Sequence, residues 1–276
     1  MKSIFLYSPA KINLTLQVLK KRNDNYHEIY TIFQKIDLWD EIEIKKTLTG
    51  FSLEFFSNFR VPLNKNLAYK AYKKFKEFFK IKDEFIIKIK KNIPIGAGLG
   101  GASSNGASIL KGLAYFYEID LNLLYPLAKE LGADVPFFLS PYPSAIGEGI
   151  GEILKPFPNF PAWYIIIYPN FQISTKWAYE NLRLTNLKNP VYYRSDIAPW
   201  NQSQGLINDF KPLVFEKYKI LESYEKLLKN LGAKAVSLSG TGSCLFGIFE
   251  EFPFSIYHTL NSFIKKGRIF LAKNLN

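Results

Sequence analysis

A glycine-rich stretch, residues 92–105, constrains this chain more than any other part of it. Its sequence is Asn-Ile-Pro-Ile-Gly-Ala-Gly-Leu-Gly-Gly-Ala-Ser-Ser-Asn. Alternating apolar residues over 85–90 predict a strand before it, and apolar spacing over 104–117 predicts a helix after it. Glycines let the backbone approach a ligand closely, and the free N–H groups at the start of a helix favour an anion. The stretch therefore predicts a loop that binds phosphate.

Three kinds of phosphate loop compete for this stretch. Gly96, Gly98 and Gly101 fit the dinucleotide fingerprint G-x-G-x-x-G, but that fingerprint also needs a second strand ending in an acid about 20 residues further on. Asp120 has the right position, yet residues 120–131 have helical spacing. A Walker loop requires lysine where Ala102 stands. The pattern P-x-G-A-G-L-G-G-[AG]-S-S matches at every position, and a plain turn would need one or two glycines rather than four.

This third pattern resembles the ATP loop of the GHMP kinases, which include galactokinase, homoserine kinase, mevalonate kinase and phosphomevalonate kinase. The resemblance implies that backbone N–H groups of the loop hold the phosphates of ATP. Mg²⁺ is expected with ATP because it bridges phosphates with few protein ligands, and Ser103 and Ser104 are candidates to contact it. The residues that the resemblance assigns to ATP are Pro94, Gly96, Ala97, Gly98, Leu99, Gly100, Gly101, Ala102, Ser103 and Ser104.

Composition bounds the class of protein. The chain has 276 residues, of which 47% are apolar, so a sizeable core is expected and disorder is not. Its one cysteine, Cys244, excludes an internal disulfide, which suits a reducing compartment. We find no apolar run of the roughly 20 residues that a membrane helix needs, and the N-terminal apolar run is too short for a signal peptide. We therefore expect a cytoplasmic protein that does not bind a membrane.

The positive charge could indicate nucleic acid or an anionic substrate. The 36 Lys and Arg outnumber the 24 Asp and Glu, which gives a net charge of +12. The lysines are scattered in pairs such as Lys20-Lys21 and Lys90-Lys91, and no long basic block is present. Scattered lysines are typical of a solvated surface, so we expect no nucleic-acid partner.

The first strand carries two polar residues on one face. Alternation over residues 7–18 puts Ile12 and Leu14 on one side and Lys11 and Asn13 on the other. Pro9 is expected at the entrance of this strand. Taken alone, Lys11 is an ordinary exposed lysine and His27, which follows the polar turn 20–25, an ordinary loop histidine. Residues 29–46 predict one or two further strands, broken near Trp39-Asp40.

The segments around these residues make the resemblance more specific. Residues 8–14, Ser-Pro-Ala-Lys-Ile-Asn-Leu, resemble the P-A-K-I-N-L signature of one GHMP branch, the 4-diphosphocytidyl-2-C-methyl-D-erythritol kinases, and Tyr26-His27-Glu28 resembles the Y-H-E that follows it. This resemblance assigns cytosine stacking to Tyr26, hydrogen bonding of the base to His27, and substrate binding to Asn13. A flat aromatic ring and an imidazole suit such a base. Asn25 stands where the branch usually has glycine, and we expect the turn to survive because Asn tolerates the left-handed region.

Asp134 lies in the segment Gly-Ala-Asp-Val-Pro-Phe-Phe, residues 132–138. From spacing alone, a helix N-cap and a catalytic carboxylate are equally good interpretations, since Pro136 starts helices well. The resemblance implies that Asp134 is the catalytic carboxylate and that it works with Lys11. Residues 144–152 also resemble a strand entry of the same branch.

Two later segments complete the predicted site. Loose alignment to the branch places Thr175 on a substrate-contacting threonine and Tyr179 on a second aromatic residue that sandwiches the base; a helix cap and a core aromatic are equally good alternatives. Residues 239–242 resemble the third GHMP motif, which folds back beside the phosphates, although a hairpin turn would also explain them. The residues of that motif are Ser239, Gly240, Thr241 and Gly242.

Periodicity predicts the remaining elements. Helices are expected over 66–79 with Asn66 as N-cap and Leu67, Ala71, Phe75 and Phe78 as its apolar stripe, over 121–131, from 174 or 175 onward, and over 214–231. Strands are expected over 163–168, 235–239 and 244–249, and a polar loop over 188–204. Residues 208–210 resemble the N-D-[LF] segment of the family, and this resemblance implies a structural turn there.

The chain is thus predicted to be an α+β protein with the two-domain GHMP kinase fold and the active site in the cleft between the domains. The expected domains are residues 1–155, which bind ATP, and residues 156–276, with the boundary in a proline cluster. The resemblance implies ATP-dependent phosphorylation of the 2-hydroxyl of a cytidine-diphosphate substrate in the non-mevalonate route to isoprenoid precursors. A GHMP-type kinase for another small alcohol, a basic nucleic-acid-binding module and a nicotinamide-dependent oxidoreductase are the alternatives.

Overall fold

The computed structural model describes residues 2–57, 59–184 and 189–276. By their contacts these residues form two compact units, each built from separate stretches of the chain. The first unit comprises the described residues within Met1–Ala10, Leu38–Ile95 and Gly100–Pro141, and the second comprises those within Lys11–Asp37, Gly96–Leu99 and Tyr142–Asn276. Strands β1 (Ser3–Lys21) and β2 (His27–Thr47) contribute to both units. A linear boundary after residue 155 stays a prediction.

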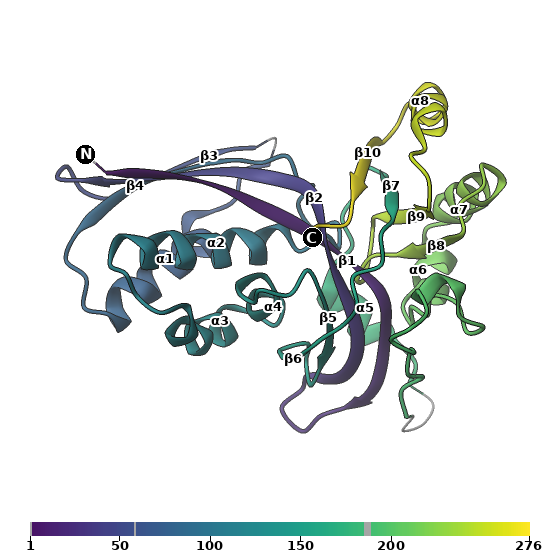
Figure 1. Cartoon of the computed structure of the whole chain (residues 1–276), viewed down its shortest axis with the longest axis horizontal. Helices are drawn as coiled ribbons and strands as arrows, with labels where there is room; N and C mark the ends of the chain where they lie inside the picture. Colours follow the sequence, from purple (N-terminus) through teal and green to yellow (C-terminus); the bar gives the residue numbers. More distant parts are fainter. Residues whose placement is uncertain (1, 58, 185–188) are drawn as a thin grey trace. The chain divides into compact units, whose positions relative to one another are not determined.

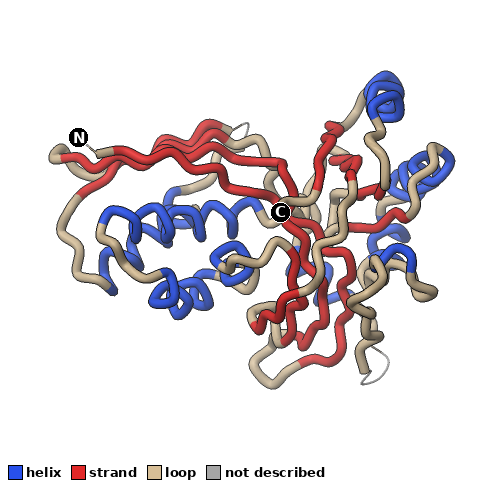
Figure 2. The backbone as a smooth tube through the Cα atoms, viewed as in Figure 1, coloured by secondary structure: helices blue, strands red, loops and turns tan. Residues whose placement is uncertain are grey.

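The first unit is a sheet with helices on one face (Figures 1 and 2). The second part of β2 pairs antiparallel with β4 (Glu84–Lys90), and β3 (Ser52–Phe56) pairs parallel with β4. The register sets Ile42 opposite Ile89 and Ile44 opposite Ile87. Because side chains alternate along a strand, these isoleucines share the buried face of the sheet.

Four helices pack in this unit: α1 (Leu67–Phe78), α2 (Gly101–Phe116), α3 (Tyr125–Leu131) and α4 (Val135–Leu139). Short 3-10 helices span Leu63–Lys65 and Leu121–Leu124. The predicted cap of α1 is confirmed, since Asn66 Oδ1 accepts a hydrogen bond from the Ala68 N–H at 3.0 Å. Buried Phe75 of α1 and Leu110 of α2 belong to the same hydrophobic core as the sheet isoleucines.

The second unit contains the remaining parts of β1 and β2 and a separate antiparallel sheet. Strand β5 (Ser144–Glu148) pairs antiparallel with β2 and with β6 (Ile153–Pro156). The separate sheet has the order β10 (Arg268–Lys273), β7 (Trp163–Tyr168), β9 (Leu245–Phe249) and β8 (Ala235–Leu238). Its helices are α5 (Thr175–Asn181), α6 (Lys211–Lys217), α7 (Ile220–Asn230) and α8 (Phe254–Phe263), with a 3-10 helix over Pro199–Asn201. The continuous apolar run of β7 suits its place between two other strands.

Three predicted boundaries are wrong. Strand β2 continues through Trp39-Asp40 without a break, because the Asp40 carboxylate is buried among polar partners rather than exposed at a chain reversal. The helix predicted over 214–231 is two helices, α6 and α7, since Tyr218 leaves helical geometry at φ −121° and ψ 73°. Helix α2 begins at Gly101, three residues before the expected start.

Smaller differences concern single residues. Phe78, expected on the apolar stripe of α1, is 54% exposed because it lies in the last turn of the helix. Pro9 lies inside β1 rather than at its entrance; β2 is the ladder partner of β1, and a strand paired on one side tolerates a missing N–H on the other. The polar loop predicted over 188–204 includes the 3-10 helix, and residue 188 lies outside the described residues.

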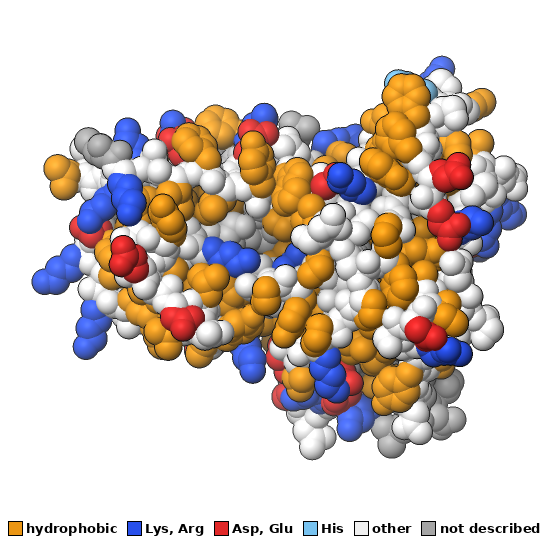
Figure 3. Space-filling model, viewed as in Figure 1, with side chains coloured by type: hydrophobic (Ala, Val, Ile, Leu, Met, Phe, Trp, Pro, Cys, Tyr) orange, Lys and Arg blue, Asp and Glu red, His pale blue; other side chains and the backbone are white. Residues whose placement is uncertain are grey.

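Charge is dispersed over the face of the molecule drawn in Figure 3. On the face drawn in Figure 3, Lys and Arg side chains alternate with acidic, polar and hydrophobic ones, without a continuous basic stripe. Among the described residues, none of the helices has both the length and the apolar character that crossing a membrane requires.

Candidate active site

The glycine loop adopts a backbone that other residues rarely adopt. Gly96, Gly98 and Gly100 have φ values of +66°, +82° and +69°. These values lie in the left-handed region, which costs an L-residue with a Cβ about 1–2 kcal/mol. Three such positions lie within five residues between β4 and α2, so the glycines serve the conformation of the loop.

The segment Ser239–Gly242 packs against this loop within the second unit. Ser239 Oγ donates a hydrogen bond to the Gly98 carbonyl at 2.9 Å, and the Cys244 N–H donates to the Ala97 carbonyl at 3.1 Å. A Cβ on Gly98 would lie 2.0 Å from the Ser239 carbonyl oxygen, so only glycine fits there. The structure therefore brings together residues 96–99 and 239–242, which the sequence predicted to serve the same phosphates; the nearness of Ser239–Gly242 to a phosphate stays a prediction.

The N-terminus of α2 continues the loop. Gly100 is the N-cap, and no acidic residue lies in the first turn of the helix. The first N–H groups of a helix lack acceptors within the helix, and the helix dipole makes this end positive. Ala102 is exposed and Ser103 is half-buried, whereas Ser104 is fully buried and its hydroxyl lies 2.7 Å from the Ser8 hydroxyl. The Ser104 hydroxyl is thus occupied in the fold, which leaves Ser103 as the serine better placed to meet a ligand.

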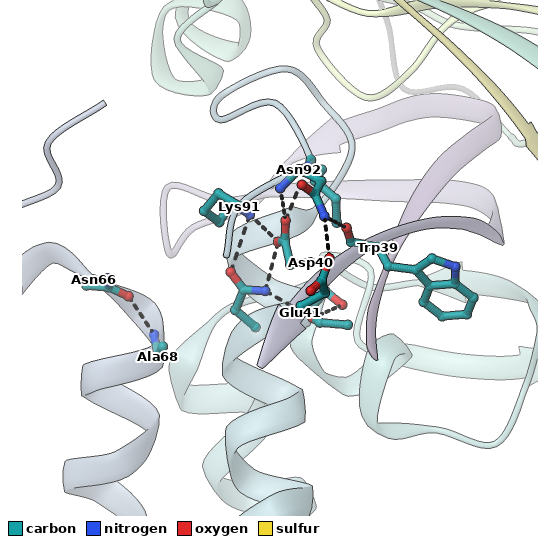
Figure 4. A network of polar contacts seen from close by, with 11 residues as sticks. Trp39, Asp40, Glu41, Asn66, Ala68, Lys91 and Asn92 are labelled. Atoms are coloured by element: carbon teal, nitrogen blue, oxygen red, sulfur yellow. Dashed lines mark hydrogen bonds and ion pairs between the residues drawn. The ribbon is translucent and has the colours of Figure 1, made fainter. Parts of the chain in front are cut away.

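A buried polar network contacts the two ends of the glycine loop, and the sequence did not predict it (Figure 4). The Asp40 carboxylate is 0% exposed. Its Oδ1 accepts from the N–H groups of Asn92 and Ile93 at 2.8 and 3.0 Å, and its Oδ2 contacts the Lys91 amine and accepts from Asn105 Nδ2 at 2.9 Å. Asp40 therefore holds both the chain that enters the loop and the helix that leaves it. An acidic residue inside an otherwise alternating strand pattern was the signal, because a buried carboxylate needs partners.

Lys91 completes this network. Its side chain is only 5% exposed, and burial lowers the pKa of its amine while the neighbouring Asp40 carboxylate opposes that shift. Asn105 Nδ2 also donates to the Ser8 hydroxyl at 3.0 Å, so the network extends to the hydroxyl pair of Ser8 and Ser104.

Lys11 and Asn13 lie on one face of β1, as predicted. Lys11 Nζ donates to Asn13 Oδ1 at 2.6 Å, and the two residues are 4% and 2% exposed. The Lys11 amine also lies 5.3 Å from the centre of the Phe33 ring. The interpretation of Lys11 as an ordinary exposed lysine is therefore wrong.

Asp134 occupies the N-cap position of α4, but its side chain makes no capping hydrogen bond. The predicted N-cap position is therefore confirmed, but without a capping hydrogen bond from the side chain. The catalytic role of Asp134 stays a prediction. Helix α4 packs against α2, and Lys111 of α2 donates to the Phe138 carbonyl near the end of α4 at 2.8 Å. Burial lowers the pKa of the Lys111 amine. These contacts hold α4, which Asp134 precedes, against α2, which begins at the glycine loop.

The residues predicted to bind the base lie partly together in the second unit. Asn25 has φ +66°, which confirms that asparagine takes the left-handed conformation in this turn. Tyr26 beside it is 59% exposed. The His27 ring lies 4.9 Å from the Tyr179 ring at an interplanar angle of 30°, so His27 is the ring of the Tyr-His pair that contacts Tyr179. Burial, with a smaller contribution from Lys21, lowers the pKa of His27 and so favours the neutral imidazole, which offers one donor and one acceptor.

Thr175 begins α5 and is exposed, and its hydroxyl lies 3.4 Å from the Thr241 hydroxyl. The cap of α5 is Ser174, whose Oγ accepts from the Trp177 N–H at 3.3 Å, so Thr175 has no capping duty. Within the described residues, we find no group of three or more His, Cys, Asp or Glu side chains arranged to hold a metal ion.

An α+β fold with a left-handed glycine loop ahead of a helix, and a serine- and glycine-rich turn packed on that loop, defines a small-molecule kinase of the GHMP type. Comparison with known families agrees. The model of the GHMP kinases N terminal domain matches residues 66–141, and the model of the GHMP kinases C terminal domain matches residues 189–265.

Similar proteins narrow this class. The 4-diphosphocytidyl-2-C-methyl-D-erythritol kinase of Syntrophus aciditrophicus is 37% identical over 251 residues, which cover 89% of this chain and 90% of the relative. The enzyme of that name from Geobacter metallireducens is 37% identical over 259 residues, with 91% of each covered. The chain therefore belongs to the GHMP kinases, in the family of the 4-diphosphocytidyl-2-C-methyl-D-erythritol kinases.

Solved structures give the same fold. A crystal structure of 4-(cytidine 5'-diphospho)-2C-methyl-D-erythritol kinase matches with a TM-score of 0.84 and 30% identity, covering 99% of this chain and 100% of that one. Homoserine kinase from Cytophaga hutchinsonii matches with a TM-score of 0.71 over 99% of this chain and 95% of its own. Its 17% identity shows the shared fold alone.

Proposed function

We propose that this chain transfers the γ-phosphoryl group of ATP to the 2-hydroxyl of 4-diphosphocytidyl-2-C-methyl-D-erythritol, a step in the non-mevalonate route to isoprenoid precursors. Relatives that carry this substrate in their names align over about nine-tenths of the chain, and this observation carries the proposal. The supporting geometry is the left-handed glycine loop, closed by Ser239–Gly242, together with the buried pair Lys11 and Asn13.

The glycine loop binds the phosphates of ATP in this proposal. Phosphoryl transfer depends on positioning and on stabilising the negative charge that spreads over the transferring group. The backbone N–H groups of residues 96–104 and the positive end of α2 supply that charge stabilisation. Ser239–Gly242 closes the loop from the other side.

Two side chains act on the acceptor hydroxyl. Asp134 takes its proton or orients it as the oxygen attacks phosphorus. Lys11 keeps the carboxylate ionised and stabilises charge on the attacking oxygen. Asn13 orients Lys11 through their hydrogen bond and contacts the substrate.

The cytidine diphosphate end of the substrate binds at the aromatic residues. Tyr26, exposed at a fixed turn, stacks on the cytosine ring, and neutral His27 hydrogen-bonds its edge. Thr175 and Tyr179 line the same site, and the existing contact between His27 and Tyr179 orients the imidazole.

Mg²⁺ would accompany ATP in this proposal. Half-buried Ser103, in the first turn of α2, would be the residue that helps to hold the ion beside the phosphates of ATP. The ion would supply neutralisation of phosphate charge. We also assign the protein to the cytoplasm and divide it after residue 155 into an ATP-binding half and a substrate half.

The test is an ADP-release assay over a panel of alcohols with ATP and Mg²⁺. The panel contains 4-diphosphocytidyl-2-C-methyl-D-erythritol, the same compound without its cytidine, homoserine and mevalonate. We expect turnover with the cytidine compound to exceed that with the others by at least about a hundredfold. The other alcohols lack the cytidine, so the polar groups that would hydrogen-bond the base stay without partners. Equal turnover with another alcohol would overturn the substrate assignment.

A further inference from the structure

A chain of hydrogen bonds with fixed polarity lies beside Lys11. Thr31 of β2 is 0% exposed, and its Oγ1 lies 2.6 Å from the Thr15 carbonyl oxygen. A carbonyl only accepts, so the Thr31 hydroxyl proton is used there. The same Oγ1 must then accept from its other neighbour, Asn13 Nδ2, at 2.8 Å.

This polarity decides which way the Asn13 amide faces. Its nitrogen is turned toward Thr31, so its oxygen is turned toward Lys11, where Oδ1 accepts from Nζ at 2.6 Å. An ammonium group has donors only, so both ends of the amide require the same orientation. A flipped amide would set NH₂ against the Lys11 amine and leave two oxygens facing each other at Thr31.

We infer that Thr31 is a positioning residue for Lys11, acting through the Asn13 amide. Asn13 is 2% exposed, so little water is at hand to replace a lost partner. This inference rests on the proposed function, in which Lys11 stabilises charge during phosphoryl transfer.

The packing around Thr31 fixes its rotamer. Gly147 of β5 lies opposite Thr31 in the register, and a Cβ on Gly147 would lie 3.0 Å from Thr31 Cγ2 and 2.6 Å from the Phe33 ring. Threonine is stiff at χ1 because it branches at Cβ. The hydroxyl of Thr31 therefore points in one direction. The Phe33 ring, which packs against the same glycine, has its centre 5.3 Å from the Lys11 amine.

Two matched comparisons test the role of the hydroxyl: wild type against Thr31→Val, and Thr31→Ser against Thr31→Ala. Thr31→Val keeps the shape of threonine, and Thr31→Ala differs from Thr31→Ser only by the hydroxyl. We expect kcat to fall about tenfold or more in the valine and alanine variants, because a small misplacement of a catalytic group is costly. Thr31→Ser should stay within about twofold of the wild type in kcat, and KM for ATP should be unchanged in all three. If Thr31→Val does not fold, the serine and alanine pair makes the same comparison.

Two further measurements separate positioning from general damage. In an Asn13→Ala background, Thr31→Val should lower kcat no further, since residues that act in series are not additive. Thr47→Val is the matched control: it removes a buried hydroxyl from the same strand, bonded to Thr49 at 2.9 Å, and should leave kcat unchanged. Equal losses of kcat in Thr31→Ser and Thr31→Ala, or full additivity with Asn13→Ala, would overturn the inference.

A readout without turnover keeps this inference apart from the proposed function. The ¹⁵N–¹H signal of the Asn13 side-chain amide, assigned by its absence in Asn13→Ala, should shift in Thr31→Val and Thr31→Ala and stay in place in Thr31→Ser. An unmoved signal in the variants without the hydroxyl overturns the inference whatever the kinase activity. A moved signal together with wild-type turnover in Lys11→Met supports the amide orientation and refutes the catalytic role of Lys11.

Discussion

At the scale of the residue, the orientation of a buried polar side chain depends on which of its atoms its neighbours require as donor or acceptor. The Lys11 amine faces an oxygen because Asn13 gives its nitrogen to Thr31. Asp134, in contrast, starts a helix without capping it, so its carboxylate has no capping duty at α4.

Asp134→Asn should lose turnover while keeping nucleotide affinity. The amide has nearly the same shape but cannot take the hydroxyl proton, and general base catalysis contributes about 10²- to 10⁴-fold. The measurements are kcat by ADP release and ATP affinity by calorimetry. The control is Asp120→Asn, because Asp120 caps a short 3-10 helix through its contact with the Asn122 N–H. Wild-type turnover in Asp134→Asn would refute the catalytic assignment.

Tyr26→Ala should weaken the cytidine substrate far more than ATP. Stacking on an aromatic ring contributes about 1–3 kcal/mol per base, so KM for the cytidine substrate should rise roughly 5- to 150-fold. Tyr115→Ala is the matched control, since Tyr115 is also a tyrosine with 62% of its surface exposed but lies in α2. A parallel rise in KM for ATP would remove the stacking role.

At the scale of the element, the glycine loop combines backbone strain with close packing. Gly98 needs glycine for two reasons: φ is +82°, and a Cβ would lie 2.0 Å from the Ser239 carbonyl oxygen. Gly50, in the turn between β2 and β3, has φ +93° but nothing within 4 Å of the position of a Cβ. These two glycines therefore separate the cost of the left-handed conformation from the cost of the loop contact.

Gly50→Ala should cost only the left-handed strain, about 1–2 kcal/mol of unfolding free energy, with KM for ATP unchanged. Gly98→Ala should add the displacement of Ser239 and raise KM for ATP about tenfold or more, because the loop can no longer close on that side. Urea unfolding and steady-state kinetics with varied ATP measure the two effects. The same KM for ATP in both variants would mean that the Ser239 contact does not shape the ATP site.

At the scale of the whole molecule, the sequence pattern predicted the helices and strands better than the breaks and long-range contacts between them. Local periodicity and capping chemistry account for the strand over 163–168, for the strand predicted over 85–90 and observed over 84–90, and for the cap at Asn66. They do not account for the partners of Asp40, since Lys91 and Asn105 lie 51 and 65 residues away in sequence. The break between α6 and α7 at Tyr218 was equally hidden, because no glycine or proline marks it.

The same holds for the site. The motifs predicted the loop and the shared face of Lys11 and Asn13 because both depend on neighbouring residues. The contact between the His27 and Tyr179 rings depends on chain folding that no local pattern carries, so the sequence predicted that Tyr179 would face a base and not that it would touch the imidazole.

The buried network around Asp40 gives the last prediction, on the stability of the first unit. Asp40→Asn should lower the free energy of unfolding by about 3–5 kcal/mol, because it leaves the buried Lys91 amine without its carboxylate partner. Glu41→Gln is the matched control one residue along: its ion pair with Lys90 spans 2.9 Å but is 47% and 61% exposed, so its loss should cost at most about 1 kcal/mol. Urea unfolding of the two variants measures the difference. Equal costs would mean that Asp40 does not hold the entry to the glycine loop, whereas a large cost with raised KM for ATP would tie this pair to the fold and to the proposed ATP site together.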